Sequence, residues 1–344
     1  MHNVAILGAT GLVGETLVRI LEERKFPVKE LRLFASEHSA GTKVRFQDRE
    51  IAVKALDEAK FEDTDLVFSA LDDALTQKVV PRAMKHCLVI DKSSAYRLKD
   101  DVPLVVPEVN PEKIAGHKNL IATPNCTTIP LVMVLAPLSC EFGLKRVVVA
   151  SYQAASGAGR DALEQYHYET EFVALEGCPG TRSRIEAIRV MSPCTDSPFP
   201  RQLAGNVIPQ IGRFQADGYT SEEHKLIAET RKIMELADLP ITVTCVRVPV
   251  ATGHALAVLA ELEQKATVKQ ARAVLKDAAG LEVSEQDSYP TPLDAAGRDK
   301  VLVGRIRPDT ASANGLHFWI VTDNLRKGAA LNAVQIAEQA LKKK

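Results

Sequence analysis

The sequence contains no closely spaced pair of cysteines. Its six cysteines lie at positions 87, 126, 140, 178, 194 and 245, and no two of them form a C-x-x-C motif. This spacing argues against a structural zinc site or a disulfide framework, and it suits a reducing compartment. We therefore predict no metal site and expect a cytoplasmic protein.

The sequence also has no excess of either charge and no long apolar run. Lys and Arg (43) balance Asp and Glu (44), and the two signs are interspersed. This balance gives no support for binding to nucleic acid or to a membrane surface. No apolar run approaches the ~20 residues of a membrane-spanning helix, and the first residues resemble a strand rather than a signal peptide.

One cysteine has an unusually polar setting. Cys126 lies between Asn125 and Thr127, after a strand-like run (residues 120–122) and before an apolar helical run (residues 131–138). At a helix N-terminus, unpaired N–H groups and the helix dipole favour an anion. We therefore expect a lowered thiol pKa, a nucleophilic thiolate and donors for an oxyanion. The alternative is a buried structural cysteine.

A glycine-rich turn follows the first predicted strand. Residues 3–7 form a short apolar run, Gly8, Gly11 and Gly14 follow with G-x-x-G-x-x-G spacing, and a helical pattern covers residues 15–23. Strand, glycine turn and helix are the context in which a backbone binds a dinucleotide pyrophosphate. The alternative is a plain tight turn between strand and helix.

The second predicted strand ends where such a fold contacts the adenosine ribose. Residues 31–35 run into Ser36, Glu37, His38 and Ser39. Glu37 suits the 2′-hydroxyl of NAD, whereas the two serines and His38 suit the 2′-phosphate of NADP. Composition alone leaves this choice open.

The order of the predicted elements indicates an α/β protein. The chain of 344 residues is too long for one ordinary core, so we expect two domains. Strands at 66–70, 88–90, 104–106 and 120–122 alternate with helices and predict a Rossmann-type, mostly parallel sheet. Beyond residue 146, strands in series predict an α+β domain with a largely antiparallel sheet. A homodimer would cover the outer face of that sheet.

A thiolate beside a nucleotide site suggests one chemistry. The thiolate adds to an aldehyde, hydride leaves to NAD(P)⁺, and a thioester remains; the reverse reaction reduces an acyl phosphate. His254, in a glycine-containing turn, is an acid/base candidate, and Arg247 lies on an apolar strand. Glu222 and Lys225 share a helix face, and Arg97 is a phosphate candidate. The alternatives are a core histidine, a solvated ion pair and a surface arginine.

Nine short stretches, in this order and spacing, resemble the bacterial aspartate-semialdehyde dehydrogenase family over essentially the whole chain. They are residues 8–14, 93–97, 106–110, 124–128, 151–159, 206–212, 222–230, 247–254 and 323–333. The resemblance implies the reversible conversion of aspartate-semialdehyde, phosphate and NADP⁺ into aspartyl-4-phosphate and NADPH. This step belongs to the pathway to lysine, threonine and methionine.

The same resemblance implies roles for individual residues. Cys126 is implied as the nucleophile, His254 as the acid/base and Gln153 as the residue that orients the acyl intermediate. The implied clamps on the substrate carboxylate and ammonium are Arg247 and Glu222. The implied phosphate and acyl-phosphate contacts are Arg97, Asn125 and Lys225. The implied cofactor contacts are Gly8, Thr10, Gly11, Leu12, Val13, Gly14, Ser36, Ser39, Ser156, Gly157 and Asn324.

The resemblance also implies how the chain is divided. Residues 1–127 are expected to form the NADP-binding domain, joined by a C-terminal helix at 325–344. Residues 128–324 are expected to form the catalytic and dimerisation domain. The expected assembly is a homodimer or a dimer of dimers.

Four residues depart from the family pattern. His38 stands where many relatives carry Arg, and Lys92 stands where they often carry Asn. Asp72 and Asp73 replace a glycine-rich stretch along the cofactor edge, where they would disfavour a phosphate-bearing cofactor or simply face solvent. The alternatives are an N-acyl-glutamyl-phosphate reductase and a non-catalytic nucleotide-binding paralogue.

Overall fold

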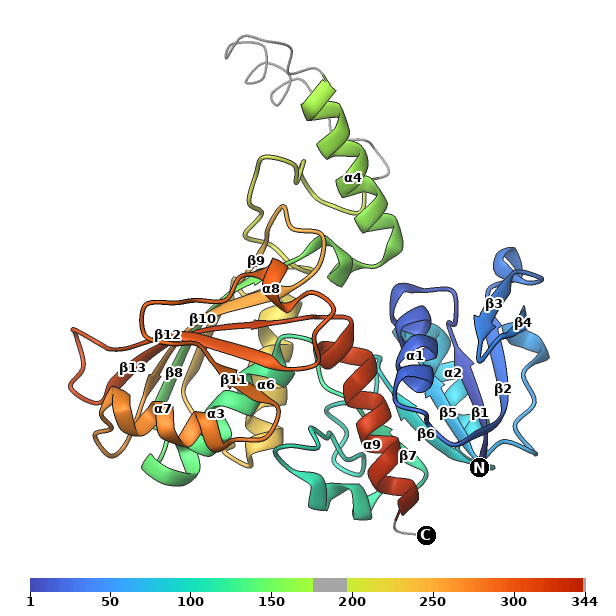
Figure 1. Ribbon diagram of the computed structural model, residues 1–344, viewed down its shortest axis with the longest axis horizontal. Helices are drawn as coiled ribbons and strands as arrows, with labels where there is room; N and C mark the ends of the chain where they lie inside the picture. The colour runs from blue at the N-terminus through green and yellow to red at the C-terminus, as the bar shows by residue number, and fades with distance from the viewer. Residues whose placement is uncertain (176–196, 343–344) are drawn as a thin grey trace.

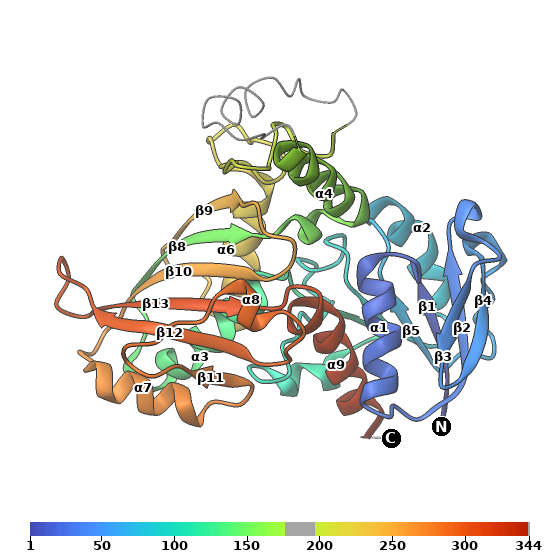
Figure 2. The same cartoon turned by 45° about the horizontal axis from the view of Figure 1, so that its top comes forward.

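Two β-sheets organise the protein. The computed structural model describes residues 1–175 and 197–342, and Figures 1 and 2 show one sheet near the two termini and the other on the far side of the molecule. The first sheet contains β1 (His2–Leu7), β2 (Val28–Ala35), β3 (Lys43–Phe46), β4 (Arg49–Ala55), β5 (Leu66–Ser69), β6 (Leu88–Asp91) and β7 (Leu120–Ala122). The second contains β8 (Arg146–Gln153), β9 (Ile241–Arg247), β10 (His254–Glu261), β11 (Leu281–Val283), β12 (Val301–Pro308) and β13 (Gly315–Thr322).

The first sheet has the predicted Rossmann-type arrangement. Its strand order is β3-β4-β2-β1-β5-β6-β7, and all neighbours are parallel except the β3–β4 hairpin. Helices α1 (Leu12–Glu23) and α9 (Leu331–Lys342) share one apolar cluster on one face of this sheet, while buried residues of α2 (Asp73–Ala83) belong to the other cluster. The last described helix of the chain therefore packs beside the first one (Figure 1).

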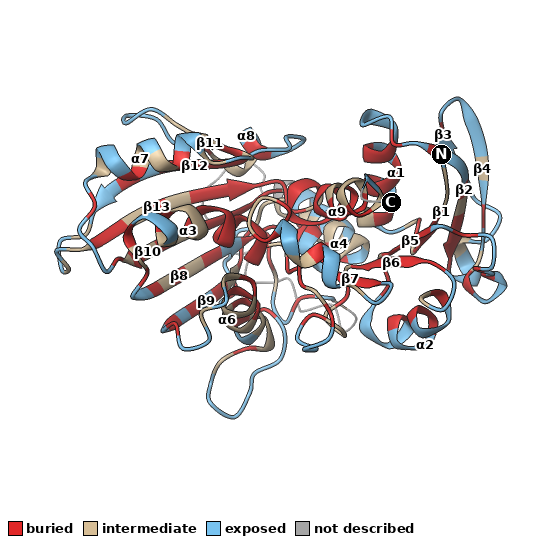
Figure 3. Cartoon of the chain, turned by 90° about the horizontal axis from the view of Figure 1, so that it is seen from below, coloured by how far each residue is buried: buried red, intermediate tan, exposed pale blue. Residues whose placement is uncertain are grey.

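The second sheet is mixed. Its order is β11-β12-β13-β10-β8-β9; the three inner pairings are antiparallel and the two edge pairings are parallel. The expectation of a largely antiparallel sheet is confirmed. One face is covered by α3 (Thr128–Phe142), α6 (Ser221–Met234) and α7 (Val268–Asp277), whose buried residues share a core cluster with the strands. Figure 3 shows buried residues along both sheets and exposed residues on the outward sides of α2 and α7.

The remaining described elements are short or peripheral. They are α4 (Arg160–Leu175), α8 (Pro292–Ala295), the 3₁₀ turns η1 (Glu37–Ser39), η2 (Leu56–Glu58), η3 (Pro111–Gly116) and η4 (Ala155–Ala158), and the π-helical turn η5 (Arg326–Ala330). Within the described ranges, no helix is both long enough and apolar enough to cross a bilayer.

The glycine turn after β1 determines how closely α1 approaches the sheet. A Cβ added at Gly14 would lie 2.1 Å from the Gly8 carbonyl oxygen, and Gly8 itself has φ +80°. Only glycine fits such a close approach without a shift of the main chain. The first turn of α1 is thereby held directly over the end of β1.

We expect Gly14→Ala to destabilise the protein by about 1–3 kcal/mol, because the methyl group forces the backbone apart. Urea unfolding followed by far-UV circular dichroism measures this change. Gly116→Ala is the matched control, since a Cβ there meets nothing within 4 Å. Equal unfolding midpoints for Gly14→Ala and the control would contradict the packing argument.

Candidate active site

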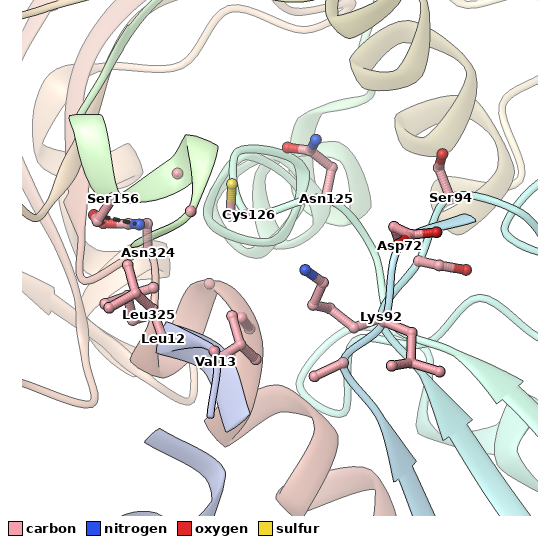
Figure 4. Close-up of a pocket in the computed structure, with 18 of the residues that line it drawn as sticks. Leu12, Val13, Asp72, Lys92, Ser94, Asn125, Cys126, Ser156, Asn324 and Leu325 are labelled. Carbon is pink, nitrogen blue, oxygen red and sulfur yellow. Dashed lines mark hydrogen bonds between the residues drawn. The ribbon is translucent and has the colours of Figure 1, made fainter. Parts of the chain in front are cut away.

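One cavity of about 690 Å³ lies between the two sheets. It receives residues from the glycine turn, the ends of β5 and β6, the turn before α3, η4, α6 and η5 (Figure 4). Of the predicted site residues, it is lined by Gly11, Leu12, Val13, Gly14, Arg97, Asn125, Cys126, Ser156, Gly157, Glu222, Lys225 and Asn324. The cavity therefore brings the predicted cofactor turn and the predicted thiol into one space.

Cys126 occupies the predicted turn between a strand and a helix. It lies between β7 and α3, and Thr127 is the N-cap residue of α3. The Asn125 side-chain oxygen accepts hydrogen bonds from the N–H (2.8 Å) and the hydroxyl (2.6 Å) of Thr127. A Cβ at Gly328 would lie 3.2 Å from the Cys126 Cβ, so a glycine of η5 packs against the thiol residue.

The expectation that the pKa of the Cys126 thiol is lowered is wrong when only the groups of the protein act on it. Burial, followed by the charge of the Glu222 carboxylate, raises the pKa of Cys126 to about 12. The positive charges of Arg97, Arg247 and Lys92 act in the opposite direction but do not outweigh these effects. The helix N-terminus alone does not compensate for removal of the thiolate from water.

A buried carboxylate on α6 holds the turn around Cys126. One oxygen of Glu229 accepts from Arg97 (2.8 Å), and the other accepts from the backbone N–H of Asn125 (2.6 Å). Glu222 precedes Glu229 by seven residues on the same helix. It accepts a hydrogen bond from the Asn125 side-chain amide (2.9 Å), and its carboxylate lies 3.9 Å from the Lys225 ammonium. Glu229 is absent from the sequence-based predictions. Its spacing of seven residues from Glu222 places both residues on one helix face. This spacing is the sequence pattern that indicates Glu229 as a site residue.

His254 and Arg247 are buried side chains that pack against Gly157, a residue of the cavity lining. A Cβ at Gly157, which lines the cavity, would lie 3.0 Å from His254 Nε2 and 3.1 Å from an Arg247 guanidinium nitrogen. The backbone N–H of Ala154 donates to His254 Nδ1 (3.0 Å), so the neutral ring carries its proton on Nε2. Nε2 has no partner in the part of the chain that the structure describes. Burial, together with the charge of Arg247, lowers the pKa of His254 to about 3.

Arg247 is buried without a counter-ion. It donates to the Ala154 carbonyl oxygen (2.6 Å), and no carboxylate of the described residues lies within 4 Å of it. Burial lowers the pKa of its guanidinium. Gln153, at the end of β8, is also buried and donates to the Ser151 hydroxyl (3.2 Å); it does not line the cavity.

The predicted cofactor contacts fall into three groups. Gly11, the N-cap of α1, has no side chain to bond the first-turn N–H groups, which therefore remain available to a ligand. Thr10, Ser36 and Ser39 do not line the cavity; Thr10 donates to the Ser39 hydroxyl (3.2 Å), which lies 3.5 Å from that of Ser36. Gly8 does not line it either and serves the close packing of the turn.

On the opposite wall, Asn324 connects η4 to the end of the second sheet. Its amide nitrogen donates to the Ser156 hydroxyl (3.0 Å), and its oxygen accepts from the Gly253 N–H (2.9 Å). The Ser156–Asn324 bond is visible in Figure 4. The two predicted residues therefore form one polar contact on the cavity wall.

Asp72 and Asp73, which depart from the family pattern, accept hydrogen bonds from other residues of the protein. Asp72 is the N-cap of α2 and accepts from the Leu75 N–H (2.9 Å). Asp73 accepts from the backbone N–H of Ser94 (2.7 Å) and from its hydroxyl. Both line the cavity and are exposed to solvent, as one of the two alternatives expected. Glu37 and His38 are also exposed, at the end of β2.

The described cysteines and acidic residues form no metal cluster. No group of three or more His, Cys, Asp or Glu in residues 1–175 and 197–342 is arranged to hold an ion. Cys87, Cys126, Cys140 and Cys245 are free thiols. Cys178 and Cys194 lie outside the described residues.

Comparison with protein families matches both parts of the chain. Residues 3–117 match the model described as the NAD binding domain of semialdehyde dehydrogenase. Residues 135–327 match the model described as its dimerisation domain. The glycine turn thus lies in the first match, and Gln153, Arg247 and His254 lie in the second.

Individual relatives and structures agree with these matches. Aspartate-semialdehyde dehydrogenase from Bacillus subtilis is 42% identical over 99% of this chain and 97% of its own, and that from Aquifex aeolicus is 45% identical over 99% and 98%. The structure of aspartate semialdehyde dehydrogenase II complexed with ASA from Vibrio cholerae has a TM-score of 0.93 and 40% identity, covering 99% of this chain and 98% of that one. The enzyme with NADP from Candida albicans has a TM-score of 0.72 and 25% identity, covering 99% and 98%.

The fold, the cavity and these similarities agree over nearly the whole length of the chain. A nucleotide-binding sheet and a mixed second sheet meet at one thiol, as the sequence resemblance implied. The chain belongs to the aspartate-semialdehyde dehydrogenase family of oxidoreductases.

Proposed function

We propose that the enzyme interconverts aspartate-semialdehyde plus phosphate and aspartyl-4-phosphate, with NADP as cofactor and a thioester on Cys126. The observation that carries this proposal is the single cavity that joins the N-terminus of α1 to the thiol and to the cations Arg97 and Lys225. The Vibrio cholerae neighbour complexed with ASA and the Candida albicans neighbour with NADP support it. The reaction belongs to the aspartate pathway to lysine, threonine and methionine.

The glycine turn and the hydroxyl cluster fit a dinucleotide phosphate. The uncapped first turn of α1 suits the pyrophosphate, because its N–H groups and dipole favour an anion. The hydroxyls of Thr10, Ser36 and Ser39 lie together at the end of β2 and suit a 2′-phosphate. Ser156, Gly157 and Asn324 would hold the nicotinamide end. When bound, this cofactor accepts a hydride in one direction and returns it in the other.

The substrate's amino-acid part pairs with two charged side chains. A buried guanidinium without a carboxylate partner favours an anion, so Arg247 binds the α-carboxylate. Glu222 lies beside the thiol and binds the α-ammonium. That ammonium also neutralises the carboxylate that raises the thiol pKa. Substrate binding therefore favours the thiolate.

The chain's own groups suit the covalent steps. Once the Cys126 thiol has lost its proton to solvent, the thiolate Sγ adds to the aldehyde carbon, and the His254 Nε2–H donates to the resulting hemithioacetal oxyanion. After loss of the hydride, the acyl group remains on Sγ as a thioester, which Gln153 orients. A phosphate oxygen then attacks the thioester carbon, the C–S bond breaks, and the thiolate is released.

Arg97, Lys225 and Asn125 suit the phosphate. Arg97 Nε is buried and has no partner in the described ranges, so it is a donor available for a phosphate oxygen. Lys225 is partly exposed in the cavity and its nearest carboxylate is 3.9 Å away. These donors lie next to the thiol, where the attacking phosphate must reach the thioester.

We infer that residues 1–127 together with 325–344 form the nucleotide-binding domain and that residues 128–324 form the catalytic domain. The shared apolar cluster of α1 and α9 supports this division. A homodimer, or a dimer of two such dimers, follows from the open face of the second sheet. That face carries partly exposed apolar side chains at Val148, Ala150, Tyr152, Leu259 and Trp319. The free thiols of the described cysteines suit a cytoplasmic location.

The direct test is reduction of nicotinamide by the wild-type enzyme with aspartate-semialdehyde, followed by absorbance. We expect phosphate-dependent turnover with NADP⁺ and slower turnover with NAD⁺, because the hydroxyls of Thr10, Ser36 and Ser39 suit a 2′-phosphate. The semialdehyde of N-acyl-glutamate serves as the comparison substrate. A higher kcat/KM with that substrate, or turnover that is independent of phosphate, would contradict the proposal.

We expect Glu222→Gln to lower the pKa of the Cys126 thiol by about one unit, because a carboxylate beside the thiolate is removed. The pH dependence of iodoacetamide alkylation, measured on the peptide that contains Cys126, reports this pKa. Glu235→Gln, an exposed residue at the end of the same helix, is the control and leaves the profile unchanged. An unchanged or raised pKa in Glu222→Gln would show that this carboxylate does not control the thiol.

A further inference from the structure

Lys92 projects into the cavity from the end of β6, the strand next to the edge strand β7 of the first sheet. It follows β6 directly, and its side chain lines the cavity. Figure 4 shows its ammonium directed toward the part of the cavity that holds Cys126 and Asn125, rather than toward the backbone of Leu12 and Val13. The ammonium therefore faces the thiol end of the site.

Lys92 differs from the other cavity-lining cations because it has no carboxylate partner within 4 Å among the residues that the structure describes. Four cationic side chains line the cavity in the described ranges, and three of them lie within 4 Å of a carboxylate. The pairs are Arg97–Glu229 (2.8 Å), Arg160–Glu15 (2.7 Å) and Lys225–Glu222 (3.9 Å). Lys92 forms no such pair with any described residue, so among these four cations it is the one without a carboxylate partner.

Asp91 and Asp73, two carboxylates whose charges act on the Lys92 ammonium, form no ion pair with it and are bound by other side chains. Asp91 accepts from the Ser93 hydroxyl (2.6 Å), and burial raises the pKa of this carboxyl, which favours its neutral form. Asp73 is held by Ser94. Burial, followed by the charge of Arg97, lowers the pKa of the Lys92 ammonium. A partly buried cation beside a second cation is stabilised by an anionic ligand.

We propose that Lys92 is a third cation of the phosphate site and binds a phosphoryl oxygen of the substrate beside Cys126. The inference rests on the proposed function, which supplies a phosphate to this end of the cavity. Glu229 offsets Arg97, and Glu222 partly offsets Lys225, so Lys92 provides the positive charge that a phosphate dianion requires. An Asn at this position would offer an amide donor but no charge.

The test compares Lys92→Met with Lys92→Arg in the phosphate-dependent direction at constant ionic strength. We expect Lys92→Met to raise the KM for phosphate at least 10-fold while the KM values for NADP⁺ and aspartate-semialdehyde change less than 2-fold. Lys92→Arg restores most of the phosphate affinity because it keeps the charge. Lys78→Met, which removes an exposed lysine from α2, is the control and leaves all three constants unchanged. Circular dichroism verifies that each variant is folded.

A second measurement does not depend on turnover. Inorganic phosphate bound next to the thiol opposes the thiolate and slows alkylation of Cys126 by iodoacetamide. We expect the half-effective phosphate concentration to rise at least 10-fold in Lys92→Met and to stay near the wild-type value in Lys92→Arg. This readout tests Lys92 even if the wild type has no phosphate-dependent turnover, a result that would overturn the proposed function alone.

Three results would overturn the assignment of Lys92. The first is an unchanged phosphate requirement in Lys92→Met by both measurements. The second is a rise in the KM for NADP⁺ as large as that for phosphate, which would assign the ammonium to the cofactor's phosphates. The third is a shifted pH profile of Cys126 alkylation with an unchanged KM for phosphate, which would make Lys92 a group that acts on the thiol only.

Discussion

The buried carboxylate of Glu229 joins the parts of the site into one unit. It binds the guanidinium of Arg97, which follows β6 in the first sheet, and the backbone N–H of Asn125, next to the thiol. It reaches both from α6, which packs on the second sheet. Removal of either Arg97 or Glu229 would leave the other charge buried without its partner, which typically costs about 3–5 kcal/mol. The thiol residue, the Arg97 guanidinium and α6 are thus fixed relative to one another.

In the proposed function, the electrostatics of the cavity make formation of the Cys126 thiolate depend on the bound substrate. Burial and Glu222 keep the thiol of Cys126 protonated, and burial with Arg247 keeps His254 neutral. In the proposed function, the two site cations without a carboxylate partner in the described ranges receive ligand groups of opposite sign: an α-carboxylate at Arg247 and a phosphate at Lys92. Interactions that are completed only by the correct substrate favour both binding and specificity. A thiol held protonated is also protected from unwanted oxidation.

Local patterns predicted much of the fold and less of the site. The glycine turn, the alternation of strands and helices and the position of Cys126 depend on neighbouring residues, and the structure confirms them. The strand expected at 104–106 is wrong: flanking prolines remove N–H donors, and only a bridge from Leu104 to Ala122 forms. The thiol pKa was not predictable, and the only sequence signal for Glu229 was its spacing from Glu222, because both depend on contacts with α6, about 100 residues away from Cys126 in sequence. The tautomer of His254 likewise requires the backbone of Ala154.

Trapping the acyl-enzyme tests the central claim, that Cys126 carries the substrate covalently, most directly. The wild-type protein is mixed with aspartate-semialdehyde and NADP⁺ without phosphate, quenched in acid and digested for mass spectrometry. The account predicts one aspartyl group as a thioester on the peptide that contains Cys126, and its disappearance after addition of phosphate. Nicotinamide reduction without modification of Cys126, or an acyl group on another residue, would contradict the account.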